Sequence, residues 1–218
     1  MQALRRRVEG SNEYVVDGED LTLIGTAEMP LTGYHADEIL DEKDLPLLYA
    51  GYSPVLPEKR REHTANTPAN YSEYTNLTNW KCTHSVCRNN PKKFMKKSLS
   101  VEEALWQQIG ISYHVVNIAA GDLDAPAAKK YDIEYWSPVD QTYRELTSCS
   151  NCTDYQARGL NIRVRRENGT IESVHTLNGT AVSLARSLVV ILENFQNQDG
   201  TLTVPEVLRP YMNGRDVI

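Results

Sequence analysis

Four polar side chains lie close together in one strand-like segment, and their types suit a metal ion and a nucleotide. The segment TYRELTSCS carries Arg144, Glu145, Thr147 and Ser148 toward its end. A carboxylate and two hydroxyl groups can together hold a metal ion and an adenylate. The alternative is an ordinary half-exposed strand, which the residue pattern alone favours.

A single arginine interrupts the small-residue face of an apolar helical segment. Arg186 follows Ala181, Ser183 and Ala185 on that face. A cation on a buried helix face needs an anion beside it, because an unpaired buried charge is costly. The anion is either a carboxylate of the protein or a phosphate group of a ligand.

The cysteines and histidines give no strong metal-site pattern. Cys149 and Cys152 have the C-x-x-C spacing that can bind a metal or do redox chemistry. Cys82 and Cys87 would have to complete a zinc site from an aperiodic stretch, so structural thiols are favoured. The five histidines form no HExxH pattern, and no P-loop or Rossmann glycine signature occurs.

Charge is distributed unevenly along the 218 residues. The net charge of −6 argues against a protein that coats nucleic acid, whose affinity comes from neutralising phosphates. Residues 57–97 nevertheless hold nine Lys/Arg and three Asp/Glu, so this stretch differs from the acidic remainder. Neither a bilayer-spanning apolar run nor a secretory signal is present, and cysteines are few. These features favour one cytoplasmic domain without a membrane segment.

The elements that position these residues are mostly strands in antiparallel runs. We therefore predict an α+β fold, with an antiparallel β-sheet flanked by helices. The predicted strands are 14–17, 21–25, 45–56 (buried), 113–121, 133–138, 142–150, 161–167 and 170–177. The predicted helices are 34–43, 100–109, 125–132 and 180–197, with a solvated helix entry at 91–97.

Local signals support several of these elements. Ser100 and Glu103 form a capping box for one helix, and Gly110 ends it. Asn168-Gly169 indicates a tight hairpin. The 180–197 helix should bury one apolar face, formed by Leu184, Leu188, Ile191, Leu192 and Phe195. Residues 1–13 read as a leader and 57–80 as loop, because neither stretch shows a regular period.

Long sequence strings resemble the catalytic core of seryl-tRNA synthetases, which are class II aminoacyl-tRNA synthetases. The matching strings include IGTAEMPLTGYHADEIL, LPLLYAGYSP, YRELTSCSNCTDYQARGLNIRVR, HTLNGTAV and DGTLTVPEVLRPYM. They cover residues of about 14–54 and 110–214, in family order. The resemblance implies a class II antiparallel sheet flanked by helices, in agreement with the predicted α+β fold, and it implies the substrates ATP with Mg²⁺ and L-serine.

The resemblance also assigns roles by position. Thr26, Ala27 and Glu28 match the serine-binding loop, where the carboxylate would pair with the substrate ammonium. Asn178 belongs to the same pocket, and Thr180 matches the contact to the serine hydroxyl. The resemblance assigns ATP binding to Glu145, Leu146, Thr147, Ser148 and Arg186. Of these, Glu145 and Arg186 would be catalytic, with Arg186 as the phosphate clamp of motif 3, and Glu145 and Ser148 would hold Mg²⁺.

The chain departs from the family pattern in three places. The N-terminal coiled-coil arm that grips tRNA is missing from the sequence, and so is motif 1, which should precede residue 14. Motif 2 is disrupted, because its two ATP-binding residues and its serine-pocket glutamate fall on Pro57, Lys59 and Trp80. The resemblance implies a homodimer, but motif 1 would form its interface, so the expected core is incomplete.

The aberrant segment 57–80 has two explanations. Arg60-Arg61-Glu62 is either a displaced motif 2 or a chance match in a basic run, and chance is favoured because the overall length is unchanged. Equal length suggests that residues 55–79 are encoded in a shifted reading frame. Sequencing the gene through this stretch distinguishes a frameshift from true divergence.

Three functions remain open from the sequence. The first is a serine–tRNA ligase that forms seryl-adenylate and transfers serine to tRNA(Ser), or to tRNA(Sec), with weak or no activity as this fragment. The second is a non-catalytic synthetase-like module that retains the fold. The third, a ligase that loads an amino acid onto a carrier protein, is disfavoured because Thr26-Ala27-Glu28 looks like ordinary serine recognition.

Overall fold

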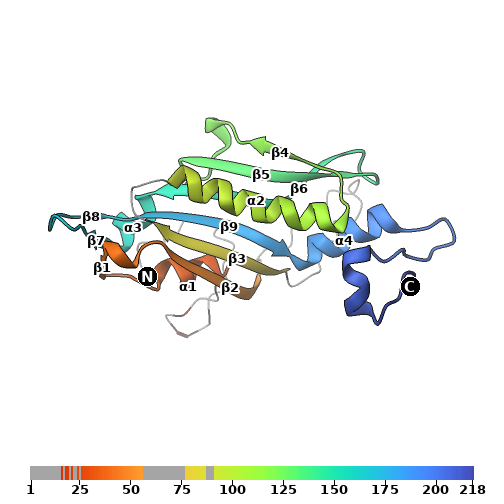
Figure 1. Ribbon diagram of the computed structural model, residues 1–218, viewed down its shortest axis with the longest axis horizontal. Helices are drawn as coiled ribbons and strands as arrows, with labels where there is room; N and C mark the ends of the chain where they lie inside the picture. The colour runs from red at the N-terminus through yellow and green to blue at the C-terminus, as the bar shows by residue number, and fades with distance from the viewer. Residues whose placement is uncertain are drawn as a thin grey trace.

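A six-stranded antiparallel sheet forms the centre of the molecule (Figure 1). The computed structural model describes residues 16, 18, 19, 21, 24, 26–55, 77–86 and 91–218, and the side chains of 53–55 and 77–86 are not described. The strand order is β2 (Leu47–Val55), β3 (Leu77–Val86), β9 (His175–Ser183), β6 (Thr142–Thr153), β5 (Lys129–Ser137) and β4 (Tyr113–Asn117). The α+β prediction is thereby confirmed.

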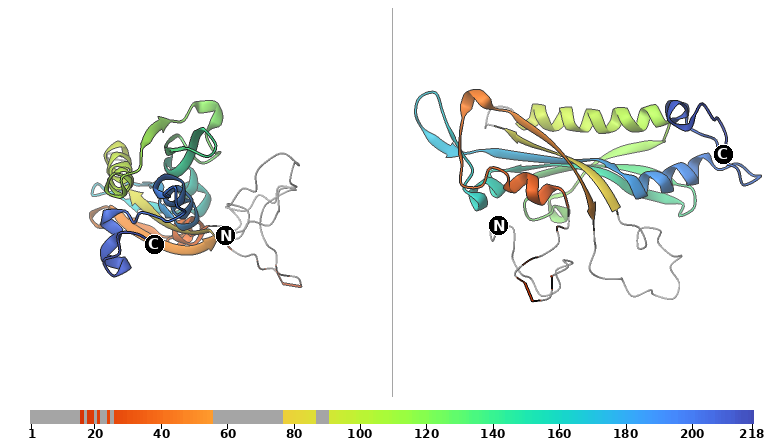
Figure 2. Two further views of the ribbon diagram at one scale, coloured as in Figure 1. Left: turned by 90° about the vertical axis from the view of Figure 1, so that its right-hand side faces the viewer. Right: turned by 90° about the horizontal axis from the view of Figure 1, so that it is seen from below.

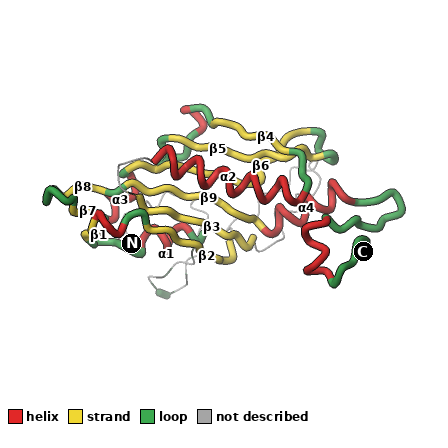
Figure 3. Tube along the Cα trace, in the orientation of Figure 1, coloured by secondary structure: helices red, strands yellow, loops and turns green. Residues whose placement is uncertain are grey.

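Helices cover the two faces of this sheet unequally. The long helix α2 (Pro91–Ile109) lies across β9 and β6 on one face, whereas α1 (Glu28–Gly33) lies on the opposite face (Figure 2). The short helix α3 (Tyr155–Leu160) follows β6 directly. Figure 3 shows these helices around the central strands, with α4 (Leu184–Phe195) continuing from the end of β9.

The main core lies between α2 and the sheet. Trp106 of α2 is fully buried against Ile133 and Leu146 of the sheet, and Val190 of α4 joins the same cluster. Burying such large apolar side chains contributes about 1.5–3 kcal/mol each. The sheet is therefore anchored to α2, and its other face is left to carry polar groups.

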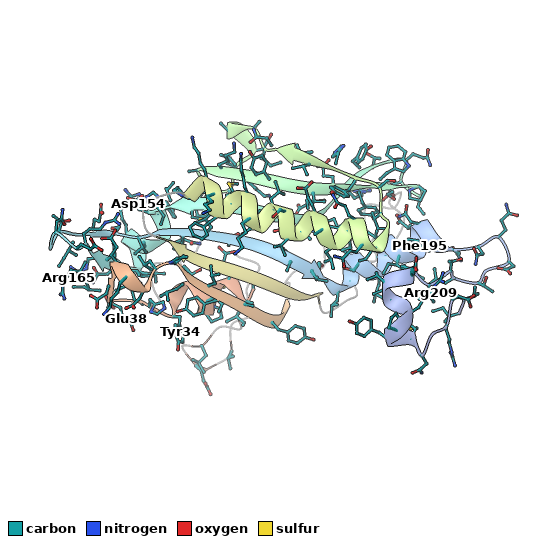
Figure 4. All side chains as sticks on the ribbon, viewed as in Figure 1. Tyr34, Glu38, Asp154, Arg165, Phe195 and Arg209 are labelled. Atoms are coloured by element: carbon teal, nitrogen blue, oxygen red, sulfur yellow. The ribbon has the colours of Figure 1, made fainter. Side chains whose placement is uncertain are left out.

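A second, smaller sheet closes one end of the molecule. It contains β1 (Ile39–Asp41), β7 (Arg163–Arg165) and β8 (Ile171–Ser173), with β1 parallel to β7 and β8 antiparallel to it. Tyr34 and Glu38 lie at the same end of the molecule as Arg165, far from Phe195 and Arg209 (Figure 4).

Several local predictions are confirmed. A hairpin joins β7 and β8 at Asn168-Gly169, where Gly169 has φ +84° and its N–H donates to the Arg166 carbonyl. Gly110 has φ +86° and ends α2, and its N–H donates to the Trp106 carbonyl. The predicted N-terminal hairpin is not confirmed: the Val16 N–H donates to the Leu21 carbonyl, but the described residues 16, 21 and 24 belong to no strand, and most of residues 14–25 and all of the 1–13 leader lie outside the described residues.

Two predicted helices are wrong because strand pairing overrides local sequence preference. Residues 34–43 form a turn, strand β1 and the start of the 3₁₀ helix η2 (Glu42–Asp44), since Ile39–Asp41 pairs with β7. In the segment 125–132, the Ala128 N–H donates to the Asn151 carbonyl, and Lys129 already begins β5. Two further 3₁₀ helices among the described residues are η4 (Ala120–Asp122) and η5 (Glu206–Met212).

Other boundaries differ from the sequence prediction. The helix predicted at 100–109 begins at Pro91, and Ser100 does not cap it, because its hydroxyl donates to the Lys97 carbonyl. The strand predicted as buried at 45–56 is an edge strand with alternating exposure, since only β3 pairs with it. Residues 77–80 belong to β3, so the loop prediction is wrong there, and 57–76 lie outside the described residues.

The predicted helix 180–197 is shorter, and its buried face is only partly the predicted one, since Ile191 and Phe195 pack against the main core as expected. Residues 180–183 belong to β9, and α4 begins at Leu184. The predicted core residues Leu184, Leu188 and Leu192 are 41–62% exposed, whereas Ala185, Ser187 and Val190 are buried. Because α4 follows β9 directly, the end of β9 sets which side of the helix faces the sheet. That side carries Ala185, Ser187 and Val190. Within the part of the chain that the structure describes, no helix is both long and apolar enough to cross a membrane.

Candidate active site on the open face of the sheet

Strand β9 separates apolar from polar side chains by simple alternation. Leu177 packs with Met95 of α2, and a Cβ atom on Gly179 would point at Glu102 of α2. The intervening Asn178 and Thr180 therefore face the opposite side, where α1 lies. The residues predicted to bind serine thus share the face that α2 leaves uncovered.

Glu28 is the centre of a hydrogen-bond network on this face. It lies in the first turn of α1, where its N–H makes a long contact of 3.4 Å with the Thr26 hydroxyl. The side-chain amide of Asn178 donates to Glu28 Oε1 at 2.7 Å. Two predicted pocket residues that are 150 positions apart in the sequence are therefore in direct contact. Ala27, the third residue of the loop, is 2% exposed and packs beneath α1.

Two further residues extend this network, and the sequence analysis assigned them no role. Gln156 of α3 donates to the same Glu28 Oε1 at 2.9 Å, and its amide oxygen accepts from the Thr176 hydroxyl at 2.6 Å. Both side chains are buried, at 6% and 1% exposed. Gln156 stands within the NCTDYQARG string, but only the fold reveals that α3 aims it at Glu28.

A β-bulge divides the predicted ATP segment between the two faces of β6. Thr147 pairs with Ile133 in the ladder, but Glu145 pairs with the adjacent Glu134, so Leu146 is the extra residue. Leu146 packs against Trp106, and the Thr147 hydroxyl faces Glu102. Glu145 and Ser148 keep the opposite face, so a ligand there could meet Leu146 and Thr147 only through their backbone.

Arg186 and Glu145 form an ion pair at the far end of this face. Arg186 Nη1 lies 3.2 Å from Glu145 Oε1, and both side chains are 40% exposed. The sequence analysis placed Arg186 on a buried face, but Ala185, Ser187 and Val190 form that face instead. Of the two anions considered for Arg186, the structure contains the carboxylate. Asn178 pairs with Ser150 of β6 in the ladder. Along β6, Ser150 and Glu145 are five residues apart, which is roughly 15 Å.

Oxygen ligands near Glu145 suit a magnesium ion. Ser148 is half-buried and pairs in the ladder with Asp132, whose carboxylate lies 3.4 Å from Lys130 Nζ. Mg²⁺ is usually held by one or two carboxylates, several waters and substrate phosphates rather than by a full protein cage. The donor set of Glu145 and Ser148 therefore fits the ion.

On the α2 side of β9, opposite Asn178 and Thr180, a buried carboxyl group packs against the strand. Glu102 is 3% exposed, and its Oε2 atom has no hydrogen-bond partner among the described residues. Burial, opposed only in part by the nearby Thr147 hydroxyl, raises its pKa from 4.5 to about 8. Glu102 is accordingly a neutral acid at pH 7.

The two cysteines of the C-x-x-C pair lie in different environments. Cys149 packs with Met95 and Leu177, and its thiol contacts the Met95 carbonyl at 3.7 Å. Burial raises the pKa of the Cys149 thiol, and the nearby Glu102 raises it further. Cys152 instead accepts a hydrogen bond from Asn178 at 3.5 Å. These environments agree with the structural role that the sequence favoured.

The positions that match motif 2 are only partly described. Pro57 and Lys59 lie outside the described residues. Trp80, at the position of the serine-pocket glutamate, lies in β3 opposite Tyr52 and Val182 in the ladder. The two antiparallel strands β2 and β3 that flank the aberrant segment are therefore present.

Comparisons with known proteins agree with this architecture. Curated relatives include serine–tRNA ligases of Dictyoglomus thermophilum, 50% identical over 201 residues, and of Pyrococcus abyssi, 44% identical over 217 residues. These matches cover 91% and 94% of this chain but 47% and 45% of the relatives, so the chain spans about half their length.

Solved structures give the same result. Seryl-tRNA synthetase of Pyrococcus horikoshii complexed with ATP superposes with a TM-score of 0.88 at 44% identity, covering 94% of this chain and 46% of that one. Cytoplasmic serine–tRNA ligase of Naegleria fowleri in complex with AMP also has a TM-score of 0.88, at 35% identity, covering 100% and 52%. The profile of the tRNA synthetase class II core domain (G, H, P, S and T) matches residues 12–195. The chain therefore belongs to the family of class II tRNA synthetase core domains.

Proposed function

We propose that this chain carries the amino-acid and nucleotide sites of a serine–tRNA ligase, and that it binds L-serine on the face formed by α1 and β9. The observation that supports the serine site most directly is the convergence of two side-chain amides on Glu28 Oε1. They orient the carboxylate of a first-turn helix residue on the open face of the sheet. An oriented carboxylate suits the ammonium group of an amino acid.

The substrate hydroxyl would meet Thr180. This residue is half-buried, two positions from Asn178 on the same strand, and so on the same face. A pocket that hydrogen-bonds a hydroxyl group rejects the analogue that lacks it, because its own polar groups are then left unpaired. The pocket would therefore select L-serine over L-alanine.

The nucleotide would lie toward the other end of β6. Arg186 would exchange its contact with Glu145 for the ATP phosphates, while Glu145 and Ser148 would hold Mg²⁺. The ion would neutralise phosphate charge. This chain's residues would contribute position and charge, since the serine carboxylate itself attacks the α-phosphate and displaces pyrophosphate. The product, seryl-adenylate, would then donate serine to the terminal adenosine of tRNA(Ser) in the cytoplasm.

A non-catalytic binding module is the second candidate. The observation in its favour is Trp80 at the motif 2 position where the family has a pocket glutamate, together with Pro57 and Lys59 at the ATP-binding positions. This candidate retains serine binding but not serine activation, which makes the two functions separable.

Titration calorimetry of the 218-residue chain tests the pocket. We expect saturable L-serine binding, no measurable L-alanine binding, and at least tenfold weaker L-serine binding in Glu28→Gln, as loss of a charge-assisted contact predicts. Glu206→Gln, an exposed carboxylate on η5, is the control and should bind as the parent does. Equal binding of L-serine and L-alanine would rule out the serine pocket.

Serine-dependent exchange of pyrophosphate into ATP separates the two candidates. Exchange above the level of Arg186→Gln would identify a ligase. Serine binding without exchange by the folded chain would identify the non-catalytic module.

A further inference from the structure

Gln156 is held at both ends of its side-chain amide. Its Nε2 group donates to Glu28 Oε1 at 2.9 Å, and its Oε1 atom accepts from the Thr176 hydroxyl at 2.6 Å. The side chain comes from α3, whereas its two partners come from α1 and β9. Three elements that are distant in sequence therefore meet at one buried glutamine.

The direction of the amide follows from the chemistry of its partners. An amide presents donors on one side and an acceptor on the other. A carboxylate oxygen accepts only, so the NH₂ group must face Glu28, and the amide oxygen then faces Thr176. A hydroxyl group can donate or accept, and here it has to donate. Glu28 thus determines which way the Gln156 amide points, and the Thr176 hydroxyl restrains the amide in that orientation.

Asn178 gives Glu28 a second donor but a different kind of support. Its Nδ2 group reaches Glu28 Oε1 at 2.7 Å and also lies 3.5 Å from Cys152 Sγ. A thiol sulfur is a weak acceptor that restrains an amide less than a hydroxyl does. Of the two donors to Oε1, Gln156 is therefore the one whose orientation is more strongly restrained.

We propose that Thr176 and Gln156 are positioning residues that act in series to orient Glu28 toward the ammonium group of the amino acid. This inference rests on the proposed role of Glu28 in binding serine. Neither residue needs to touch the substrate. Their contribution is to hold one carboxylate oxygen, so that the direction of the other is fixed before the substrate arrives.

Two nearly isosteric substitutions at one buried position test the relay. Thr176→Val removes the hydroxyl at constant shape, while Thr176→Ser keeps it. Calorimetry should show about tenfold weaker L-serine binding for Thr176→Val and parent-like binding for Thr176→Ser. L-glycerate, which carries a hydroxyl in place of the ammonium, should bind both variants as it binds the parent.

The ratio of L-serine affinity to L-glycerate affinity distinguishes a positioning role from a general disturbance of the fold. If Thr176→Val weakens L-serine and L-glycerate equally, or weakens neither, the relay is wrong. Gln156→Met should reproduce the loss of selectivity, because it keeps the length of the side chain and removes both polar contacts.

Side-chain amide signals in ¹⁵N-correlated NMR spectra give a readout that does not depend on serine. In the ligand-free chain, the Gln156 NH₂ signals should move in Thr176→Val and stay in place in Thr176→Ser. Unmoved signals in both variants would overturn the relay whether or not the chain binds serine. Moved signals with no serine binding by the parent would support the hydrogen-bond relay and reject the proposed serine site.

Discussion

Glu102 Oε1 lies 2.7 Å from the position that a Cβ atom on Gly179 would occupy. Real Cβ atoms do not approach an oxygen so closely, so the two residues restrict each other. Gly179 stands between Asn178 and Thr180 on the strand that carries the proposed serine pocket. Because Gly179 has no side chain, the Glu102 carboxyl group of α2 can pack directly against the backbone of β9.

Gly179→Ala should destabilise the protein through this one contact. The cost of forcing a methyl group into a packed site is about 1–3 kcal/mol. In a Glu102→Ala background the same glycine substitution should cost less, because the oxygen is gone. Urea unfolding of the four proteins gives the coupling energy directly. If Gly179→Ala lowers the free energy of unfolding equally in the parent and in Glu102→Ala, the contact between the two residues is contradicted.

Glu102 should also make stability depend on pH. The unfolded carboxyl ionises near pH 4.5, whereas the folded one holds its proton until about pH 8 because its pKa is raised by burial. Between these values the native state binds more protons, so the free energy of unfolding falls as pH rises and levels off above about 8. The raised pKa corresponds to at most about 5 kcal/mol.

Matched variants isolate this effect on α2. Glu102→Gln should flatten the stability profile between pH 5 and pH 8, a window that follows from the raised pKa. Glu103→Gln, the neighbouring position that accepts a hydrogen bond from Tyr113, should leave the slope unchanged. Denaturant midpoints at half-unit pH steps are the measurement, and parallel profiles for the parent and Glu102→Gln would refute the assignment.

Arg186 should matter for nucleotide binding and hardly for folding. Its ion pair with Glu145 is 40% exposed on both sides, and such pairs contribute less than about 1 kcal/mol. Arg186→Gln should therefore keep the melting temperature nearly unchanged but weaken ATP binding by at least tenfold.

A second arginine provides the control for that change. Arg158 pairs with Asp154 at 3.8 Å and is 62% exposed, and Arg158→Gln changes the net charge by the same amount. It should retain parent-like ATP affinity in the same calorimetric titration. If both variants lose ATP affinity equally, the effect is one of overall charge and the phosphate clamp is not at Arg186.

Truncation should destabilise the protein more on the buried face of α4 than on its exposed face. Val190 is fully buried against Ile133 and Leu146, whereas Leu188 is 62% exposed. Val190→Ala should cost about 1–3 kcal/mol, and Leu188→Ala should cost less than about 0.5 kcal/mol. Thermal unfolding of both variants measures the difference. A larger loss at Leu188 would restore the face that the sequence periodicity predicted.

The same helix illustrates what sequence patterns predict and what they do not. Turn chemistry is local, so Gly110 and Asn168-Gly169 were predicted at the right positions. Strand alternation identified the general fold class. The buried face of α4 depends instead on how the end of β9 orients the helix against the sheet. A hydrophobic period of 3.6 residues does not contain that information.

The candidate site divides in the same way. The resemblance named Glu28, Asn178, Glu145 and Arg186, and the structure brings the first two into contact and the last two into an ion pair. Gln156 was missed because its role arises only when α3 packs beside α1. Leu146 and Thr147 were grouped with their neighbours because sequence alone does not show a bulge.

The bulge at Leu146 shifts the alternation of side chains between the two faces of β6 by one residue. With strict alternation, Thr147 under α2 would have brought Glu145 under α2 as well, and a charged group would have faced the core. The extra residue returns Glu145 to solvent while Leu146 fills the interior. Deleting Leu146 would restore a regular ladder with Glu145 and Thr147 on their present faces, so the deletion should cost only the core packing of Leu146 against Trp106.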